Sequence, residues 1–192
     1  FSMHPLKNLN VWGDGGFVVI KKKSDYKKML LLRNHGLINR DKNLIFGYNS
    51  RLDTIQAIVA LDSLKKIQNI TNTRIANSLY LDRKLKNFKN IYLIKRKKYL
   101  KEVFHLYEIR IKNKKIRDRL IYRLIQNGID AKIHYPTPMH LQPAAKYLKY
   151  KKGDFPMAET IAKTTISLPV HEFISKSKLD IIVKIISENI KS

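Results

Sequence analysis

The stretch that decides the fold class is residues 103–136, VFHLYEIRIKNKKIRDRLIYRLIQNGIDAKIHYP. Residues 103–111 read as a strand, and residues 131–135 form another that a proline stops. Between them lies an apolar stripe of helical period that a glycine terminates. A further strand is expected over residues 90–94, so the stretch predicts a β-β-α-β unit and an α/β fold class. The helical stripe consists of Ile116, Leu120, Ile121, Leu124 and Ile125.

On the C-terminal side, three more elements are expected after a loop punctuated by prolines at residues 136–143. A helix is expected over residues 157–163 and a short strand over residues 165–168. The last element is an amphipathic helix, because its apolar residues recur at helical spacing. Its predicted buried face is Leu179, Ile182, Val183, Ile186 and Ile190.

On the N-terminal side, a glycine-rich turn at residues 13–16 leads into a β-branched run, residues 17–20, that predicts a strand. A helix is expected over residues 24–32. The Ser-x-x-Asp spacing from Ser50 predicts the start of a long helix that continues past Ile75.

This layout predicts the tail of one α/β domain joined to a smaller α/β domain. The boundary is expected at the end of the long helix. We assign residues 1–74 to the first domain with its linking helix, and residues 75–192 to the second.

Composition limits the possible functions. The 192 residues include no cysteine, which excludes disulfides, thiolate catalysis and Cys-ligated metals. No stretch approaches the roughly 20 apolar residues of a membrane helix, and no signal-peptide pattern opens the sequence, so we expect a cytoplasmic protein. The formal net charge is +24, but 29 Lys outnumber 10 Arg and are scattered. We interpret this as a solvated basic surface, with nucleic-acid binding as the alternative.

Generic catalytic motifs are lacking. The six histidines show no metal-ligand spacing, so no metal site is predicted. No glycine-rich phosphate loop or serine nucleophile elbow is present either. Taken alone, Lys7 is one lysine among 29, and a catalytic lysine needs a special, partly desolvated setting.

The context of Lys7 adds a resemblance. The stretch SMHPLKNL, residues 2–9, followed by GDGG at residues 13–16, resembles the active-site lysine region of the DegT/DnrJ/StrS family of nucleotide-sugar aminotransferases, which depend on pyridoxal 5'-phosphate (PLP). Further blocks similar to family motifs follow in order and cover nearly the whole chain. They are LRNHG at 32–36, GYNSRLDTIQA at 47–57, HYPTPMHLQP at 134–143, GDFP at 153–156 and SLP at 167–169.

The resemblance implies a fragment of a fold-type I PLP-dependent transferase: the tail of the large cofactor domain plus a complete small C-terminal α/β domain. The chain opens on Phe1 rather than on an initiator Met, which supports that expectation. The family's upstream phosphate loop, its ring-stacking aromatic and its Asp for the ring nitrogen are not in this sequence. We therefore expect the isolated polypeptide to be inactive and poorly stable.

By the same resemblance, Lys7 binds the cofactor aldehyde covalently and, once displaced by the incoming amino group, moves the proton between substrate and cofactor. Ser2 matches a hydroxyl that hydrogen-bonds the cofactor phosphate. Asn49 matches an amide that reaches the phosphate in the neighbouring subunit, which implies a homodimer with shared active sites. From the residues alone, Ser2 also fits a turn serine and Asn49 a helix-start residue.

The resemblance also implies substrate contacts. His134 and Tyr135 would face the sugar from the small domain, and His4, at a position where relatives often have Tyr, would line the pocket. Arg51 would help to hold the nucleotide diphosphate. The alternatives are a strand-end His–Tyr pair and an ion pair of Arg51 with Asp53.

The implied reaction is transamination of a nucleotide-linked keto-sugar with glutamate as amino donor, in amino-sugar and surface-polysaccharide biosynthesis. Lys-Asn-Leu followed by Gly-Asp-Gly-Gly resembles the relatives that aminate a 3-keto position, so an NDP-3-keto-hexose is the expected acceptor. One alternative is a non-catalytic regulator on the same scaffold, against which the retained Lys7 argues. The other is a basic nucleic-acid-binding protein.

Overall fold

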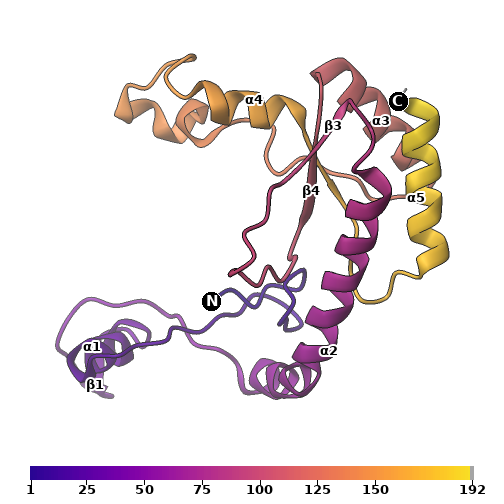
Figure 1. Ribbon diagram of the computed structural model, residues 1–192. Helices are drawn as coiled ribbons and strands as arrows, with labels where there is room; N and C mark the ends of the chain where they lie inside the picture. Colours follow the sequence, from indigo (N-terminus) through magenta and orange to yellow (C-terminus); the bar gives the residue numbers. More distant parts are fainter. Residues whose placement is uncertain (191–192) are drawn as a thin grey trace. The chain divides into compact units, whose positions relative to one another are not determined.

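The computed structural model describes residues 1–190 and has two compact units. The first is Phe1–Asn69 and the second begins at Ile70. Helices and small sheets occur in both units, so the predicted α/β class is confirmed (Figure 1). Helix α2 (Thr54–Leu85) belongs to both units, since its residues lie on either side of this division.

The second unit is organised by a three-stranded antiparallel sheet of order β3-β4-β5. These strands are β3 (Ile91–Leu93), β4 (Tyr107–Ile111) and β5 (Thr165–Leu168). The register pairs the apolar residues of β4 and β5 with each other, and on the opposite face it pairs Glu108 with Ser167. The two faces of the sheet therefore differ in chemistry, one apolar and one polar.

The apolar face of the sheet is covered by helices. Helix α3 (Lys114–Gln126) begins after Asn113, whose Oδ1 accepts a hydrogen bond from the Ile116 amide at 3.0 Å. Helix α5 (Lys176–Asn189) packs against α3. Side chains of both helices, of β4 and β5 and of the last turns of α2 form one buried cluster, which holds the unit together. Its members include Leu81, Leu85, Tyr107, Ile109, Leu120, Leu124, Ile166, Leu179, Ile182 and Ile186.

Arg117 is a buried cation in this unit. It projects from α3, and its Nη1 donates to the carbonyl oxygen of Thr165 at 3.0 Å, at the start of β5. Its Nε donates to Asp118 at 2.7 Å. These bonds satisfy a charge that would otherwise be costly to bury, and they join α3 to the connection between α4 (Pro156–Thr164) and β5.

The first unit has much less buried apolar surface. It contains α1 (Lys23–Leu32), a small hairpin of β1 (Leu37–Asn39) and β2 (Lys42–Asn43), and the first part of α2. Among the described residues of this unit, the buried apolar side chains are Met3 and Val11. Large exposed apolar side chains include Trp12, Phe17, Val18, Val19, Phe46, Ile55, Ile58, Leu61 and Leu64.

Most helices match the sequence-based expectations. Those expected at residues 24–32, 157–163 and near the C-terminus are confirmed, as is the stripe ended by Gly128, which adopts a φ of 73°. Strand β5 has the expected bounds. The hairpin β1–β2 was not predicted, and the proline-rich loop contains two short 3-10 helices, Met139–Leu141 and Pro143–Leu148.

Three expectations are wrong. Residues 17–20 form no strand, because the pairing described in this region is limited to the isolated bridge between Ser2 and Gly16 and the adjacent backbone bonds between Phe1 and Phe17. Residues 131–135 form only a bridge from Lys132 to Ser167. The long helix continues past Ile75 as expected but begins at Thr54, because the Ser50 amide donates to Arg33 instead.

Candidate active site

Lys7 lies in an N-terminal loop that closes on itself. The Lys7 amide donates to the His4 carbonyl at 2.8 Å, and the Met3 amide donates to the Gly15 carbonyl at 2.7 Å. Within the loop, the Met3 side chain is buried and the Lys7 side chain is half-buried. The lysine is therefore carried by a hydrogen-bonded loop rather than by a helix or strand.

The glycines after Lys7 allow this closure. A Cβ atom on Gly16 would lie 2.7 Å from the carbonyl oxygen of Phe1, and one on Gly15 would lie 2.8 Å from Cγ2 of Val11. Both distances are shorter than side-chain contacts allow, so a larger residue would push the two segments of the loop apart. The glycine-rich turn is thus required by close packing of the loop.

Gln56 fixes the loop to α2. Its Oε1 accepts from the Trp12 amide at 2.7 Å, and its Nε2 donates to the Trp12 carbonyl at 2.9 Å. This pair of bonds imitates a backbone ladder and satisfies both polar groups of one loop residue. Sequence reasoning included Gln56 in a family-like block but gave it no role, because its partner lies 44 residues away.

Two other predicted residues belong to the lysine loop. Ser2 Oγ accepts a hydrogen bond from the His4 amide at 3.3 Å, and the His4 Nδ1 accepts one from the Leu6 amide at 3.3 Å. Both side chains are exposed. The hydroxyl hydrogen of Ser2 remains available to a ligand, and so does the Nε2 side of the His4 ring. The structure therefore brings Ser2, His4 and Lys7 into one loop.

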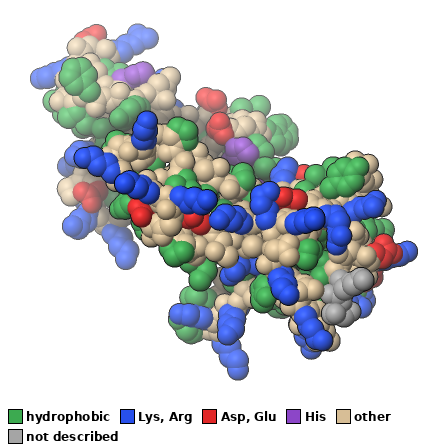
Figure 2. Space-filling view, turned by 90° about the horizontal axis from the view of Figure 1, so that it is seen from above, with side chains coloured by type: hydrophobic (Ala, Val, Ile, Leu, Met, Phe, Trp, Pro, Cys, Tyr) green, Lys and Arg blue, Asp and Glu red, His purple; other side chains and the backbone are tan. Residues whose placement is uncertain are grey.

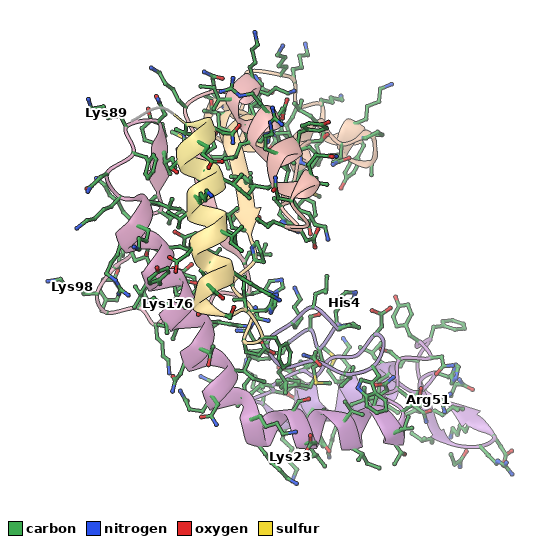
Figure 3. The ribbon with its side chains drawn as sticks, turned by 90° about the vertical axis from the view of Figure 1, so that its right-hand side faces the viewer. His4, Lys23, Arg51, Lys89, Lys98 and Lys176 are labelled. Atoms are coloured by element: carbon green, nitrogen blue, oxygen red, sulfur yellow. The ribbon has the colours of Figure 1, made fainter. Side chains whose placement is uncertain are left out.

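Asn49 and Arg51 form a separate pair in the same unit. Arg51 Nε donates to Asn49 Oδ1 at 2.9 Å, in place of the alternative ion pair with Asp53. Asn49 is also bridged to Asn34, beyond the end of α1. Figure 3 labels His4 and Arg51 at different places of this unit. The pairing leaves the Asn49 amide nitrogen as a donor next to a guanidinium, a combination suited to an anionic oxygen.

His134 and Tyr135 lie in the second unit, after the bridge that joins Lys132 to β5. Their rings meet edge to face, with centroids 5.5 Å apart, and the peptide bond between them is cis. His134 Nδ1 lies 2.8 Å from Ser167 Oγ, which in turn lies 3.4 Å from Glu108 Oε1. Tyr135 is exposed. The pair is thus anchored through its histidine.

Both residues line a cavity of about 750 Å³. Its wall comes from the proline-rich segment and from α4, and it is largely aromatic and aliphatic. Glu159 supports this segment from α4: its Oε1 accepts from the Gly153 amide at 2.6 Å and lies 3.3 Å from His140 Nε2. These bonds hold the pKa of the Glu159 carboxyl below its ordinary range. The lining of the cavity includes His134, Tyr135 and His140.

Basic side chains do not gather into one patch on the face shown in Figure 2. Blue Lys and Arg side chains are spread among apolar and neutral ones. Over the described residues, no helix is long and apolar enough to cross a membrane. Nor does this part of the chain contain a group of three His, Cys, Asp or Glu residues able to hold a metal ion.

Residues 1–187 match the DegT/DnrJ/EryC1/StrS aminotransferase family. The chain belongs to this family. It is 34% identical over 183 residues to the erythromycin biosynthesis sensory transduction protein EryC1 of Saccharopolyspora erythraea, covering 95% of this chain and 49% of that protein. It is also 34% identical over 170 residues to the dTDP-3-amino-3,4,6-trideoxy-alpha-D-glucose transaminase of Streptomyces venezuelae, covering 88% of this chain and 44% of that one.

Solved structures agree with this membership. The crystal structure of S. venezuelae DesV in complex with a ketimine intermediate matches with a TM-score of 0.92 at 31% identity, over 98% of this chain and 50% of that one. The chain therefore spans about half the length of the relatives it matches. The predicted membership of a sugar aminotransferase family is confirmed, and so is the fold class.

Pyridoxal 5'-phosphate is the cofactor of this family, as predicted, and the residues present fit it. Lys7 supplies a primary amine, the group that an aldehyde binds. Ser2 and Asn49 each keep a hydrogen-bond donor once their described bonds are made. The donor set therefore suits an aldehyde that also carries a phosphate.

Proposed function

We propose that this chain supplies the C-terminal part of a PLP-dependent aminotransferase acting on a nucleotide-linked keto-sugar. Residues 1–74 would complete the large cofactor domain and residues 75–192 would form the small domain. The observation that carries the proposal is Lys7, held half-buried in a loop that Gln56 braces, within a chain of the aminotransferase family. A lysine in a fixed loop is the arrangement that covalent attachment of an aldehyde requires.

Each predicted site residue receives a task in this proposal. Lys7 would hold the cofactor through Nζ, while the Ser2 hydroxyl and the Asn49 amide would donate to its phosphate. Asn49 would do so in the neighbouring subunit of a homodimer with shared active sites. When bound, the cofactor supplies an electron sink that stabilises negative charge on the neighbouring carbon.

Proton transfer falls to Lys7. As a free base, its Nζ would accept the proton from the amino-bearing carbon of glutamate in one half-reaction. In the other half-reaction it would deliver a proton to the sugar carbon that gains the amino group. The loop supports this task because it fixes the backbone on both sides of the lysine, at His4 and at Trp12.

Substrate binding is assigned to the remaining residues. Arg51 would hold the diphosphate, and His4, His134 and Tyr135 would contact the sugar. We propose an NDP-3-keto-hexose as acceptor, in amino-sugar and surface-polysaccharide biosynthesis in the cytoplasm. The support is the Lys-Asn-Leu and Gly-Asp-Gly-Gly pattern, together with the 34% identity to a transaminase whose name specifies a 3-amino sugar.

The test uses the complete protein that contains this sequence, loaded with pyridoxal 5'-phosphate. Borohydride reduction followed by peptide mapping is expected to place the phosphopyridoxyl mass on Lys7. Turnover of glutamate with a dTDP-3-keto-hexose is expected, and Lys7→Ala should lower it by at least about 100-fold. Lys98→Ala, at an exposed lysine of the second unit, is the matched control and should change nothing.

Three results would contradict the proposal. An adduct on a different lysine would remove Lys7 from its role. Cofactor binding without any turnover of keto-sugars would favour the non-catalytic regulator. That alternative is kept because the relative EryC1 is named as a sensory transduction protein. Salt-sensitive binding of duplex DNA without cofactor binding would favour the nucleic-acid alternative.

A further inference from the structure

Three polar side chains form a continuous hydrogen-bonded chain on the polar face of the second unit's sheet. His134 Nδ1 lies 2.8 Å from Ser167 Oγ, and Ser167 Oγ lies 3.4 Å from Glu108 Oε1. Neither Glu108 nor Ser167 was given a role at the level of sequence. Glu108 and Ser167 lie on neighbouring strands, 59 residues apart in the chain.

Backbone pairing fixes all three positions. Glu108 and Ser167 face each other in the register of β4 and β5. Ser167 is also bridged on its other side to Lys132, two residues before His134, by backbone bonds of 2.8 and 3.2 Å. The histidine therefore leaves the sheet directly beside the serine, and little side-chain freedom remains to be lost when the chain of bonds forms.

The chemistry of the three groups gives the chain a direction. An ionised carboxylate can only accept, so the Ser167 hydroxyl donates its single hydrogen to Glu108. The same oxygen must then accept from the histidine, which places a hydrogen on His134 Nδ1. In the neutral ring this leaves Nε2 as the acceptor, and no described residue bonds to it.

Glu108 is partly buried and has few polar neighbours. Burial raises the pKa of the Glu108 carboxyl, against smaller opposing effects of the Ser167 hydroxyl and of nearby His134. In the described part of the chain, no Lys or Arg forms an ion pair with it. Ser167 is thus the polar contact through which Glu108 acts.

We propose that Glu108 and Ser167 are positioning residues that hold His134 as its Nδ1–H tautomer, so that Nε2 accepts a hydrogen bond from a hydroxyl of the sugar. The inference rests on the proposed function, which places His134 at the sugar, and it adds the identity of the accepting atom. A sugar with a hydroxyl at the position that contacts His134 would be favoured over one deoxygenated there, since only the former can donate.

The first test measures the tautomer itself. The complete protein is labelled with ¹⁵N-histidine, and the His134 signals are assigned from a His134→Gln variant. At a pH where the spectrum reports a neutral ring, we expect protonated Nδ1 and unprotonated Nε2. A predominant Nε2–H form would overturn the proposal, because the chain of bonds would then run in the opposite direction.

Substitutions separate positioning from mere folding. Ser167→Ala and Glu108→Gln should reduce the excess of the Nδ1–H form, whereas Ser167→Thr, which keeps a hydroxyl and suits a strand, should retain it. Thr165→Val is the matched control: Thr165 lies on the same face of β5 and is also buried, but has no described bond to His134. Loss of the Nδ1–H form in the control would show an effect of the strand alone.

Binding of dTDP-glucose, measured by calorimetry, tests the second half of the proposal. We expect Ser167→Ala and Glu108→Gln to weaken it by roughly 3- to 10-fold, and Thr165→Val to leave it unchanged. Unchanged affinity in the first two variants would overturn the role of Nε2. Absence of transamination with an intact Nδ1–H tautomer would count against the proposed function instead, so the two failures are distinguishable.

Discussion

The two units of the chain differ in how much of their apolar surface they bury. The second unit places side chains from α2, α3, α5 and all its strands in one buried cluster. In the described part of the first unit, Met3 and Val11 are the buried apolar residues, while aromatic and aliphatic side chains such as Trp12 and Phe46 are exposed. Yet the first unit carries Lys7, on which the proposed chemistry depends.

This difference separates two ways of holding a structure. The second unit can be stabilised by burial of its own side chains, which is the dominant favourable term in folding. The first unit depends mainly on hydrogen bonds, such as those from Gln56 to Trp12 and from Ser50 to Arg33. Such bonds contribute only about 0.5 to 1.5 kcal/mol each in water. They therefore fix the conformation of the Lys7 loop but add little to its stability.

The largest expected effect is in amide hydrogen exchange of this 192-residue chain. Backbone amides of β4 and β5 should be protected by most of the free energy of global unfolding, whereas those of residues 18–20 and of the β1–β2 hairpin should exchange almost as in an unfolded chain. Mass spectrometry of peptides from the exchanging protein measures both. Equal protection of the two units would refute the comparison.

A pair of substitutions on one helix comes next in size. Leu81 and Leu61 both lie on α2, but Leu81 is 0% exposed and Leu61 is 62% exposed. Leu81→Ala should lower the free energy of unfolding of the chain by about 2 to 5 kcal/mol, because it leaves a cavity in the cluster. Leu61→Ala should change it by less than about 0.5 kcal/mol.

Urea denaturation followed by circular dichroism checks both values. Repeating the pair in the complete protein sharpens the comparison, since a cost for Leu61→Ala that approaches that of Leu81→Ala would show that the first half of α2 is buried there. Similar costs of the two substitutions in this chain would instead mean that burial does not distinguish the units.

The helices were predictable because their signals are local. A single turn supplies the Asn113 cap of α3, and the apolar stripe of that helix repeats within a dozen residues. Strand β5 was also predictable, since its short alternation of polar and apolar residues stands between a helix and a proline. In such segments the preference of the local sequence and the tertiary packing agree.

Pairing between distant segments was not predictable. Residues 17–20 have strand-like composition, but a strand needs a hydrogen-bonded neighbour along its length, and the described backbone pairing stops at Phe17, which is bonded to Phe1. Ser50 matched a capping pattern, yet its amide is bonded to Arg33 in a different segment. Glu108 was absent from the sequence-based site for the same reason, since only the register of β4 and β5 places it opposite Ser167.

A smaller effect is expected from the bonds between Gln56 and Trp12. Gln56→Ala removes the side-chain acceptor of the Trp12 amide and the side-chain donor to the Trp12 carbonyl. The free energy of local opening of the loop should fall by about 1 to 3 kcal/mol. Exchange of the Trp12 amide should accelerate by roughly tenfold or more, while that of the Ile109 amide in β4 stays unchanged. Gln56→Glu keeps the acceptor and loses the donor, so its Trp12 amide should exchange at a rate between those of the unsubstituted chain and Gln56→Ala.

The smallest expected effect concerns acid and the segment around the cavity of the second unit. Glu159 accepts from the Gly153 amide and from His140, which keeps the pKa of its carboxyl below the ordinary range in the folded state. A lowered folded-state pKa contributes stability at pH values above the ordinary pKa, and that contribution is lost as the pH falls through the folded-state value. The apparent Tm of the second unit should therefore drop on acidification below about pH 4.

Glu159→Gln should have a lower Tm at neutral pH and a flatter acid limb, since an amide has no proton to gain. Its Tm and that of the unsubstituted chain should converge at the acid end, as measured by differential scanning calorimetry. The matched control is Glu188→Gln on α5, an exposed position that should leave the whole pH profile unchanged. A constant gap between Glu159→Gln and the parent chain at all pH values would show that the carboxylate is not what secures the segment, and that its shape in the second unit depends on apolar packing alone.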